Sequence, residues 1–403
     1  MIKTSTLESK EFNFEFLEDY KDLERDLSSL VESEERLIQL SGLDPSDIKS
    51  YPVQIDYSRE SSQENTQESG GFWGFFKSFF RCRQKSVIKE KSSVYLWTYE
   101  FGDPTKPTLV FLHGYIGASL LYFKGFNFLK QHFHVYMVDL LGMGRSSRLP
   151  FDCENYEDCE EWFNSSIHAW INAMSINKYV LLGHSLGAFI AAKYATKYPE
   201  GIIKLILLSC YSVEKTSDRD LEKYYENQNS EPFGPRMFSK ALDFFLDQGY
   251  SPCGWMRYAG KKVSKMVLNQ CLDVYKRMLK REEIDAIGDY LTNLIQLNGS
   301  SEYCVPIMFP TKSITKYALW HDLENLKKHN IELSFYYADD DWCNTDYNGN
   351  LVSDQLKEEG YRVYIIPKSN HQLMASNSQE TCRSLFDDIS NSEALSILNK
   401  SFK

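Results

Sequence analysis

The pentapeptide Gly183–Gly187 constrains this chain more than any other feature. It reads Gly-His-Ser-Leu-Gly, and it lies between an apolar run at 179–182, typical of a buried strand, and a helix-forming stretch at 188–195. A serine on such a sharp turn between strand and helix, called a nucleophile elbow, is lifted above the sheet with its Oγ free. A side chain at either glycine would collide with the neighbouring strand or helix. The motif therefore predicts that Ser185 is a nucleophile.

Strands and helices alternate from residue 93 onward, which predicts a mainly parallel sheet. Val94–Phe101 alternates like an edge strand. The remaining predicted strands are short apolar runs at 108–112, 134–138, 179–182, 204–208, 332–337 and 362–366. Helical patterns cover 121–131, 159–174 and 188–197, and a helical insertion at 235–248, 261–269, 273–281 and 283–297 precedes the last two strands. We therefore expect an α/β sheet with helices on both faces and a helical cap over the carboxyl ends of the strands.

A serine nucleophile needs a base and a group that orients the base. His371 follows the last predicted strand across a short loop, which is the best position for the base. His184 is interpreted as the filler position of the turn, pointing away from the site. His113 lies in a loop at the mouth of its strand, and His321 and His329 fall on a helix, where a solvated or capping role is the default.

The orienting acid should follow the strand before the last one. There the chain contains three consecutive aspartates, Asp339 to Asp341. A turn that begins at Ala338 would return its fourth residue toward the histidine, which favours Asp341. Asp340 stays open as the alternative. The order Ser, Asp, His along the chain is the order used in strand–turn–helix sites of this kind.

Two backbone amides are expected to stabilise the oxyanion. One belongs to Leu186, the residue after the nucleophile, and the other to Tyr115 in the glycine-rich loop 113–117 after a strand. The glycine turn at 139–147 lacks the spacing and the Lys-Ser/Thr ending of a phosphate loop, so a structural role is predicted for it.

Composition excludes several classes of function. Residues 1–69 hold 7 Lys+Arg and 17 Asp+Glu and thus carry almost the whole net charge of −11, so nothing indicates a nucleic-acid-binding surface. Nine cysteines are scattered without a Cys-x-x-Cys pair, which argues against a disulfide framework or a zinc site and favours a reducing compartment. We expect no metal and no organic cofactor.

Three regions are predicted: an acidic, partly disordered arm at 1–70, an aromatic and basic segment at 71–91, and an α/β domain at 92–403 with its cap at about 213–315. In the second region six aromatic residues recur at helical spacing and are followed by basic residues. This pattern favours a helix that lies on a membrane without spanning it, the alternative being a helix packed on the domain. The N-terminus has no signal-peptide pattern, so we expect a cytoplasmic, peripherally membrane-associated protein.

Together these segments resemble the α/β-hydrolase family, and within it a lipid-metabolising subgroup. That subgroup contains the adipose-lipase coactivator, the N-acylphosphatidylethanolamine phospholipase and the fungal cardiolipin deacylase. The resemblance runs from about Gly71 to about Asp388, and its matching stretches are 110–115, 139–147, 181–187, 251–260 and Asp341–Asn344. The last of these is similar to the subgroup's Asp-Trp-Met-Asn segment, which supports Asp341 as the acid.

The resemblance implies a serine hydrolase that cleaves acyl esters of glycerophospholipids or related lipids, with a membrane or lipid-droplet surface as its partner. Two alternatives stay open, a lysophospholipid acyltransferase and a non-catalytic adaptor that recruits another lipase. The family's acyltransferase pattern, His-x-x-x-x-Asp, is not kept, because Ser376 stands at its last position. The coactivators lose the elbow serine, whereas Ser185 is present, which favours an active enzyme.

Overall fold

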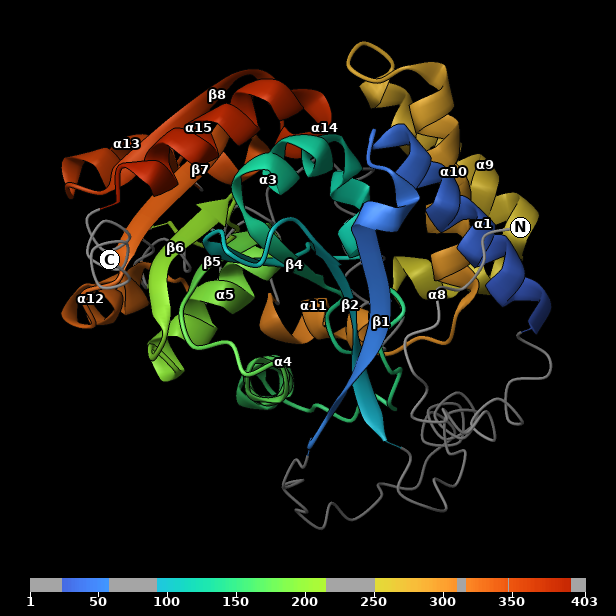
Figure 1. Cartoon of the computed structure of the whole chain (residues 1–403), viewed down its shortest axis with the longest axis horizontal. Coiled ribbons are helices and arrows are strands. Elements are labelled where there is room, and N and C mark those ends of the chain that lie inside the picture. The colour runs from blue at the N-terminus through green and yellow to red at the C-terminus, as the bar shows by residue number, and fades with distance from the viewer. Residues whose placement is uncertain (1–23, 58–92, 215–250, 310–316, 347, 393–403) are drawn as a thin grey trace, which may run out of the picture.

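The computed structural model describes residues 24–57, 93–214, 251–309, 317–346 and 348–392. Within these ranges the chain forms one eight-stranded sheet with the order β1-β2-β4-β3-β5-β6-β7-β8 (Figure 1). The strands are β1 Ile48–Ile55, β2 Val94–Phe101, β3 Thr108–Leu112, β4 His134–Val138, β5 Tyr179–His184, β6 Ile202–Leu208, β7 Glu332–Asp340 and β8 Arg362–Asn370. From β4 to β8 all neighbours are parallel, and only β1 and β2 are antiparallel to their neighbours. The predicted mainly parallel sheet is confirmed.

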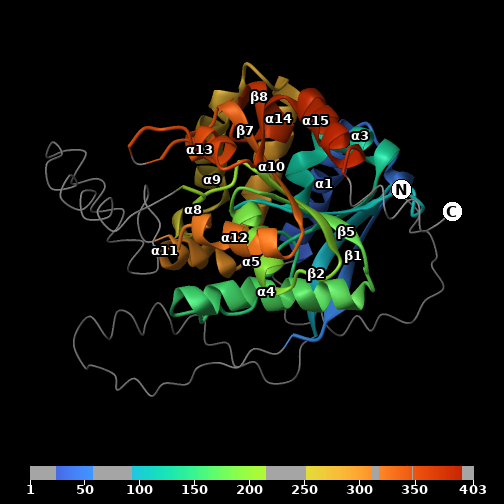
Figure 2. The same ribbon diagram turned by 90° about the vertical axis from the view of Figure 1, so that its left-hand side faces the viewer.

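Helices cover both faces of this sheet, as predicted. The helices outside the cap are α1 Glu24–Leu40, α3 Phe126–His132, α4 Tyr156–Ala173, α5 Leu186–Lys197, α12 Trp320–Lys328, α13 Val352–Glu358, α14 Leu373–Ser376 and α15 Ser378–Ser390. Figure 2 shows α4 along one face and α15 above the other. Alternate side chains of β3 enter the two cores: Val110 and Leu112 pack with α4 and α5, and Leu109 and Phe111 pack with α3 and α15.

The insertion between β6 and β7 is helical where the structure describes it. It contains α8 Pro252–Ala259, α9 Lys261–Leu272, α10 Arg281–Gln296 and α11 Cys304–Met308. The helices predicted at 261–269 and 283–297 are therefore confirmed. Of the stretch predicted at 273–281, only the short turn Asp273–Tyr275 is a 3-10 helix. The helix predicted at 235–248 lies outside the described residues.

Residues 24–57 join the α/β domain and do not stand apart as part of an acidic arm. β1 pairs with β2 along its whole length, from Ile48 opposite Phe101 to Ile55 opposite Val94. α1 packs beside α10 of the cap and buries Leu30 completely (Figure 1). The folded domain thus begins well before residue 92, where the sequence placed its boundary.

The expectation that Val94–Phe101 is an edge strand is wrong, because β1 covers it. β1 itself has the marks of an edge. It contains Pro52, which cannot donate to a ladder and is confined to edge strands or bulges. Its burial alternates at the end, with Val53 and Ile55 buried around an exposed Gln54.

The predicted membrane segment 71–91 lies outside the described residues, so its role stays a prediction. Among the helices that the structure does describe, none combines the length and apolar character needed to cross a bilayer.

Candidate active site

Ser185 stands on a strained turn between β5 and α5. Its backbone has φ 55° and ψ −120°, a conformation that L-residues rarely adopt. Glycines on either side make the turn possible. A Cβ on Gly183 would lie 2.3 Å from the carbonyl oxygen of Gly187, and a Cβ on Gly187 would lie 2.3 Å from that of His113. Both predicted collisions are therefore present in the structure.

The structure brings Ser185, His371 and Asp341 together in one hydrogen-bonded row. The Oγ of Ser185 is 3.0 Å from Nε2 of His371, and Nδ1 of His371 is 3.1 Å from Oδ1 of Asp341. A carboxylate only accepts hydrogen bonds, so Nδ1 carries the ring proton and Nε2 is left to accept the serine proton. This is the arrangement that a general base requires.

Four groups hold the carboxylate of Asp341. Oδ1 also accepts from the amide of Cys343 over 3.1 Å, while Oδ2 accepts from the hydroxyl of Ser209 over 2.5 Å and from the amide of Ala338 over 3.4 Å. Burial alone would raise the pKa of Asp341, but the hydrogen bond and charge of His371 and the other donors hold that pKa below its usual value. The carboxylate is therefore ionised and fixed in orientation.

The other two aspartates of the run have different positions. Asp339 accepts from the amides of Lys368 and Ser369, at 2.7 and 2.9 Å, and so fixes the turn that leads to His371. Asp340 is exposed at the end of β7. The structure thus sets Asp341 against the histidine, and not the alternative Asp340. The turn that begins at Ala338 returns Asp341 as expected, since the amide of Ala338 binds its carboxylate.

His184 does not point away from the site, and that expectation is wrong. Its Nε2 is 2.8 Å from the main-chain oxygen of His371, and its Nδ1 is 2.9 Å from the hydroxyl of Tyr122. That hydroxyl also accepts from the amide of Gly114 over 3.1 Å. Since a carbonyl oxygen can only accept, His184 donates from Nε2 and accepts at Nδ1.

This row of hydrogen bonds joins the loop at 114 to the backbone of the candidate base. Burial, reinforced by the nearby His371, lowers the pKa of His184 to about 3, so the ring is neutral at neutral pH. Sequence reasoning missed His184 and Tyr122 as positioning groups, and it also missed Ser209. The sequence did offer one signal for Ser209. This serine directly follows β6, and β6 lies next to β7, the strand that precedes Asp341.

Of the predicted oxyanion residues, Leu186 follows Ser185 in the chain, and Tyr115 belongs to a loop that approaches Ser185 in space. Leu186 is the first residue of α5, where amides have no partner within the helix. Tyr115 follows Gly114, which passes so close to the nucleophile that a Cβ on it would lie 3.2 Å from Cβ of Ser185. The next residue, Ile116, has φ 55°, which is strained for a β-branched residue and costs about 1–3 kcal/mol.

Cap residues hold this strained loop in place. Ile116 packs against Cys253, Leu268 and Ile295, and the hydroxyl of Tyr115 donates to the main-chain oxygen of Glu302 over 2.8 Å. Movements of the cap are therefore coupled to the loop that carries one predicted oxyanion donor.

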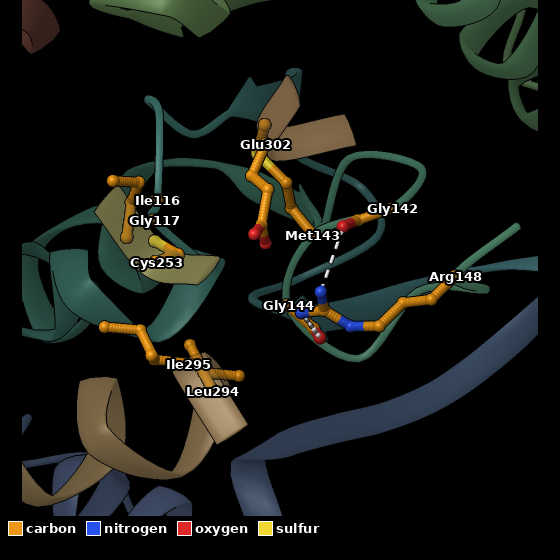
Figure 3. Close-up of a pocket in the computed structure, with 10 residues that line it drawn as sticks. All are labelled: Ile116, Gly117, Gly142, Met143, Gly144, Arg148, Cys253, Leu294, Ile295 and Glu302. Atoms are coloured by element: carbon orange, nitrogen blue, oxygen red, sulfur yellow. Dashed lines mark hydrogen bonds between the residues drawn. The ribbon is translucent and has the colours of Figure 1, made fainter. Parts of the chain in front are cut away.

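A small cavity of about 30 Å³ lies where the loop meets the cap (Figure 3). It is bounded by Ile116, Cys253, Ile295 and Met143, with the guanidinium of Arg148 lying against the carbonyls of Gly142 and Gly144. That space holds about two water molecules and is far too small for a fatty acyl chain. An acyl chain can therefore occupy this space only if the cap or the loop shifts.

Two large side chains of α8 differ in their surroundings. Trp255 is 48% exposed, whereas Met256 packs with Ile116 in a small core cluster.

One group in the described part of the chain has donors suited to a metal ion. Asp341, Cys343 and His371 each offer one ligand atom, all within 4.8 Å of one another. Asp341 and His371 already bind each other, so a metal there would compete with the hydrogen bond that orients the base.

Comparison with known proteins identifies the architecture. The family model described as alpha/beta hydrolase fold matches residues 107–240, which include the elbow and the loop at 114. The chain therefore has the α/β-hydrolase fold. The fold predicted from the sequence is thereby confirmed.

Proteins similar to this chain have names that refer to lipids. The 1-acylglycerol-3-phosphate O-acyltransferase of Arabidopsis thaliana is 27% identical over 276 residues, which cover 67% of this chain and 63% of that protein. The (lyso)-N-acylphosphatidylethanolamine lipase of Homo sapiens is 27% identical over 267 residues, which cover 66% of this chain and 74% of that protein. The match thus spans less than two thirds of the Arabidopsis protein. The predicted resemblance to the lipid-acting subgroup is confirmed.

Solved structures agree on the fold. A membrane phospholipase A described as a bacterial virulence factor superposes with a TM-score of 0.55 and 16% identity, covering 91% of this chain and 93% of that one. At this identity the likeness supports the architecture alone.

Proposed function

We propose that this α/β hydrolase is a serine esterase that cleaves acyl esters of glycerophospholipids or related lipids. The observation that carries the proposal is the row Ser185–His371–Asp341, with contacts of 3.0 and 3.1 Å. These three residues come from the ends of β5, β7 and β8 and are brought together by the parallel sheet.

The geometry supports a two-step acyl transfer. His371 takes the proton of Ser185 as the serine oxygen attacks the acyl carbonyl, and the new bond gives a tetrahedral oxyanion. The amides of Tyr115 and Leu186 would donate to that oxyanion. His371 then protonates the leaving alcohol, and the carbonyl re-forms as an acyl-enzyme on Ser185. A water molecule, deprotonated by His371, releases the fatty acid by the same steps in reverse.

The rest of the site supports this assignment. The carboxylate of Asp341 is anchored at both oxygens, so it can hold the imidazole in the required tautomer and stabilise its cation. Lipid as the substrate class is supported by the names of the relatives from Arabidopsis thaliana and Homo sapiens. Residues 71–91 would hold the protein on the cytoplasmic side of a membrane or lipid droplet.

Hydrolysis by the purified chain tests the proposal. We expect release of fatty acid from phospholipid vesicles and from a short soluble ester, and we expect Ser185→Ala to abolish both activities at unchanged thermal stability. A correctly folded wild-type chain that hydrolyses neither substrate would instead favour the alternative that the protein is a non-catalytic adaptor for another lipase. Substantial activity in the folded Ser185→Ala variant would show that another residue is the nucleophile.

Acyl transfer to a lysophospholipid is the second candidate, because the Arabidopsis relative is named an acyltransferase. In this chain Ser376, and not an acid, follows His371 at the fifth position. Its hydroxyl donates to the main-chain oxygen of Gln372 over 2.9 Å and accepts from the amide of Asn370 over 3.2 Å. A lysophosphatidate acceptor added to a labelled acyl donor separates the two reactions: free fatty acid indicates hydrolysis, and labelled diacyl product indicates transfer.

A further inference from the structure

The outer face of cap helices α8 and α9 gathers exposed apolar side chains. In the part of the chain that the structure describes, seven large hydrophobic residues are exposed, and four of them fall within the twelve residues 255–266. They are Trp255, Tyr258, Val263 and Met266. The side chains of Tyr258 and Met266 are 83% and 57% exposed. Such a concentration on one short stretch is typical of an interaction surface.

Within each helix, the spacing groups exposed side chains on one side. In α9 the buried residues Ser264, Leu268 and Leu272 recur every fourth position and face the cap interior. Met266 lies on the opposite side of that helix, together with Lys262 four residues earlier. In α8, Tyr258 follows Trp255 by three positions, so both lie on one side of that helix.

The same stretch is basic. Residues 252–272 contain Arg257, Lys261, Lys262 and Lys265 and no Asp or Glu, whereas residues 70–403 together hold 38 Lys+Arg and 39 Asp+Glu. Arg257 is turned inward and pairs with Glu302, and Lys265 pairs with Asp289 of α10. Lys261 and Lys262 are exposed beside the apolar side chains.

We propose that this face, called the cap face and made of Trp255, Tyr258, Lys261, Lys262, Val263 and Met266, docks on an anionic lipid surface. Aromatic and thioether side chains can enter the headgroup region, while lysines remain with the anionic headgroups. The choice of lipid as the occupant rests on the proposed function. The cap face is separate from residues 71–91 and supplies a second lipid contact.

Docking at the cap face would orient the active site. The inward side of α8 contributes Cys253 and Met256 to the cluster that contains Ile116, next to the predicted oxyanion residue Tyr115. The helix that touches lipid on its outer side therefore touches the oxyanion loop on its inner side.

Vesicle flotation tests the proposal without catalysis, in the full chain carrying Ser185→Ala so that the lipid is not consumed. Against vesicles of phosphatidylcholine and phosphatidylserine, Tyr258→Ser with Met266→Ser should weaken binding at least tenfold at any salt concentration. Lys261→Gln with Lys262→Gln should weaken it about fivefold per lysine at low salt, with the effect fading in high salt.

A matched control uses exposed apolar residues elsewhere. Leu351 is the residue before α13, and Ile365 lies in β8. Figure 1 shows α13 at the end of the molecule opposite α8 and α9. The double change to serine there should leave vesicle binding unaltered. Thermal unfolding of each variant verifies that the cap remains folded.

A second variant background separates the contribution of the cap face from that of the predicted membrane segment 71–91. With Phe72, Trp73, Phe75 and Phe76 changed to serine, the chain should still float with anionic vesicles, and the Tyr258→Ser, Met266→Ser pair should remove that residual binding. No residual binding in this background, or residual binding equal with and without the pair, would overturn the proposal. Flotation is independent of hydrolysis. Vesicle binding through the cap face can therefore be observed even if the chain cleaves no ester.

Discussion

His184 donates its Nε2 hydrogen to the main-chain oxygen of His371, 2.8 Å away, from the residue directly before the nucleophile. The elbow therefore positions two things: Ser185 through its strained backbone, and the base through a buried imidazole. Through Tyr122 the same imidazole is linked to Gly114 of the oxyanion loop.

Replacing His184 by phenylalanine should lower kcat by about 10- to 100-fold with little change in KM, because the base loses its backbone anchor and shifts. Tyr122→Phe should give a smaller loss, since it removes the hydroxyl and leaves the bond between His184 and His371. Steady-state kinetics on a soluble ester measures both. His184→Gln, which keeps an N–H donor, should recover part of the activity. Equal rates for wild type and His184→Phe would mean that the hydrogen bond from His184 to His371 does not position the base.

His371→Ala and Asp341→Asn should both impair formation of the acyl-enzyme, the aspartate change more mildly. Residues that act as a unit give non-additive losses, so the double variant should be little slower than His371→Ala alone. Rapid-mixing measurement of the acylation burst provides the test. Losses that multiply would argue against Asp341 as the orienting acid and would direct attention to Asp340.

Glu34 should make the stability of the fold depend on pH. It lies in α1, where Oε2 accepts from Arg145 over 3.0 Å and Oε1 accepts from the hydroxyl of Tyr99 over 3.1 Å. Burial raises its pKa from the ordinary 4.5 to about 7, although Arg145 opposes that shift. A raised carboxyl pKa means that the folded state prefers the protonated form, so this contribution is complete below pH 4.5 and is lost as pH rises toward 7.

Glu34→Gln removes the titration and keeps the shape. Relative to this variant, the wild type should lose about 3 kcal/mol of unfolding free energy between about pH 4.5 and pH 7 and no more above that range. Urea unfolding of both proteins at several pH values gives the difference directly. A difference that stays flat with pH would contradict the raised pKa of Glu34.

Gly183→Ala should destabilise the protein by about 3 kcal/mol or more, because the new Cβ would meet backbone atoms of Gly187 and Ala188 at 2.3 and 2.6 Å. Gly254→Ala is the matched control in the cap, where the nearest atom to the added Cβ would be Oγ of Ser251 at 3.3 Å. Chemical unfolding compares the two. If both variants lost a similarly small unfolding free energy, the backbone around Gly183 would relax more easily than its close contacts indicate.

Sequence alone predicted the inner strands well for a physical reason. β3 and β4 lie inside the sheet and are covered on both faces, so they read as short runs that are apolar after their first residues, Thr108 and His134. β1 was missed because it is an edge strand with an alternating pattern, contains Pro52 and lies among acidic residues. Its partner β2 is also far along the chain, and no local pattern reports that pairing.

The candidate site likewise contains residues that the sequence predicts and residues that it does not. Ser185, Asp341 and His371 could be placed because each follows a recognisable strand, and parallel strands deliver their carboxyl ends to one edge of the sheet. The roles of Ser209, His184 and Tyr122 could not be predicted. They depend on which side-chain atoms meet across neighbouring strands and loops, and a sequence does not encode that locally.

Reaction with a fluorophosphonate probe tests whether Ser185 is an activated nucleophile. The probe forms a covalent bond only with a serine whose proton can be taken by a base, and peptide mapping locates the modified residue. We expect rapid labelling at Ser185, none in Ser185→Ala and strongly slowed labelling in His371→Ala. A folded wild-type protein that does not label, or that labels at another serine, would contradict this expectation.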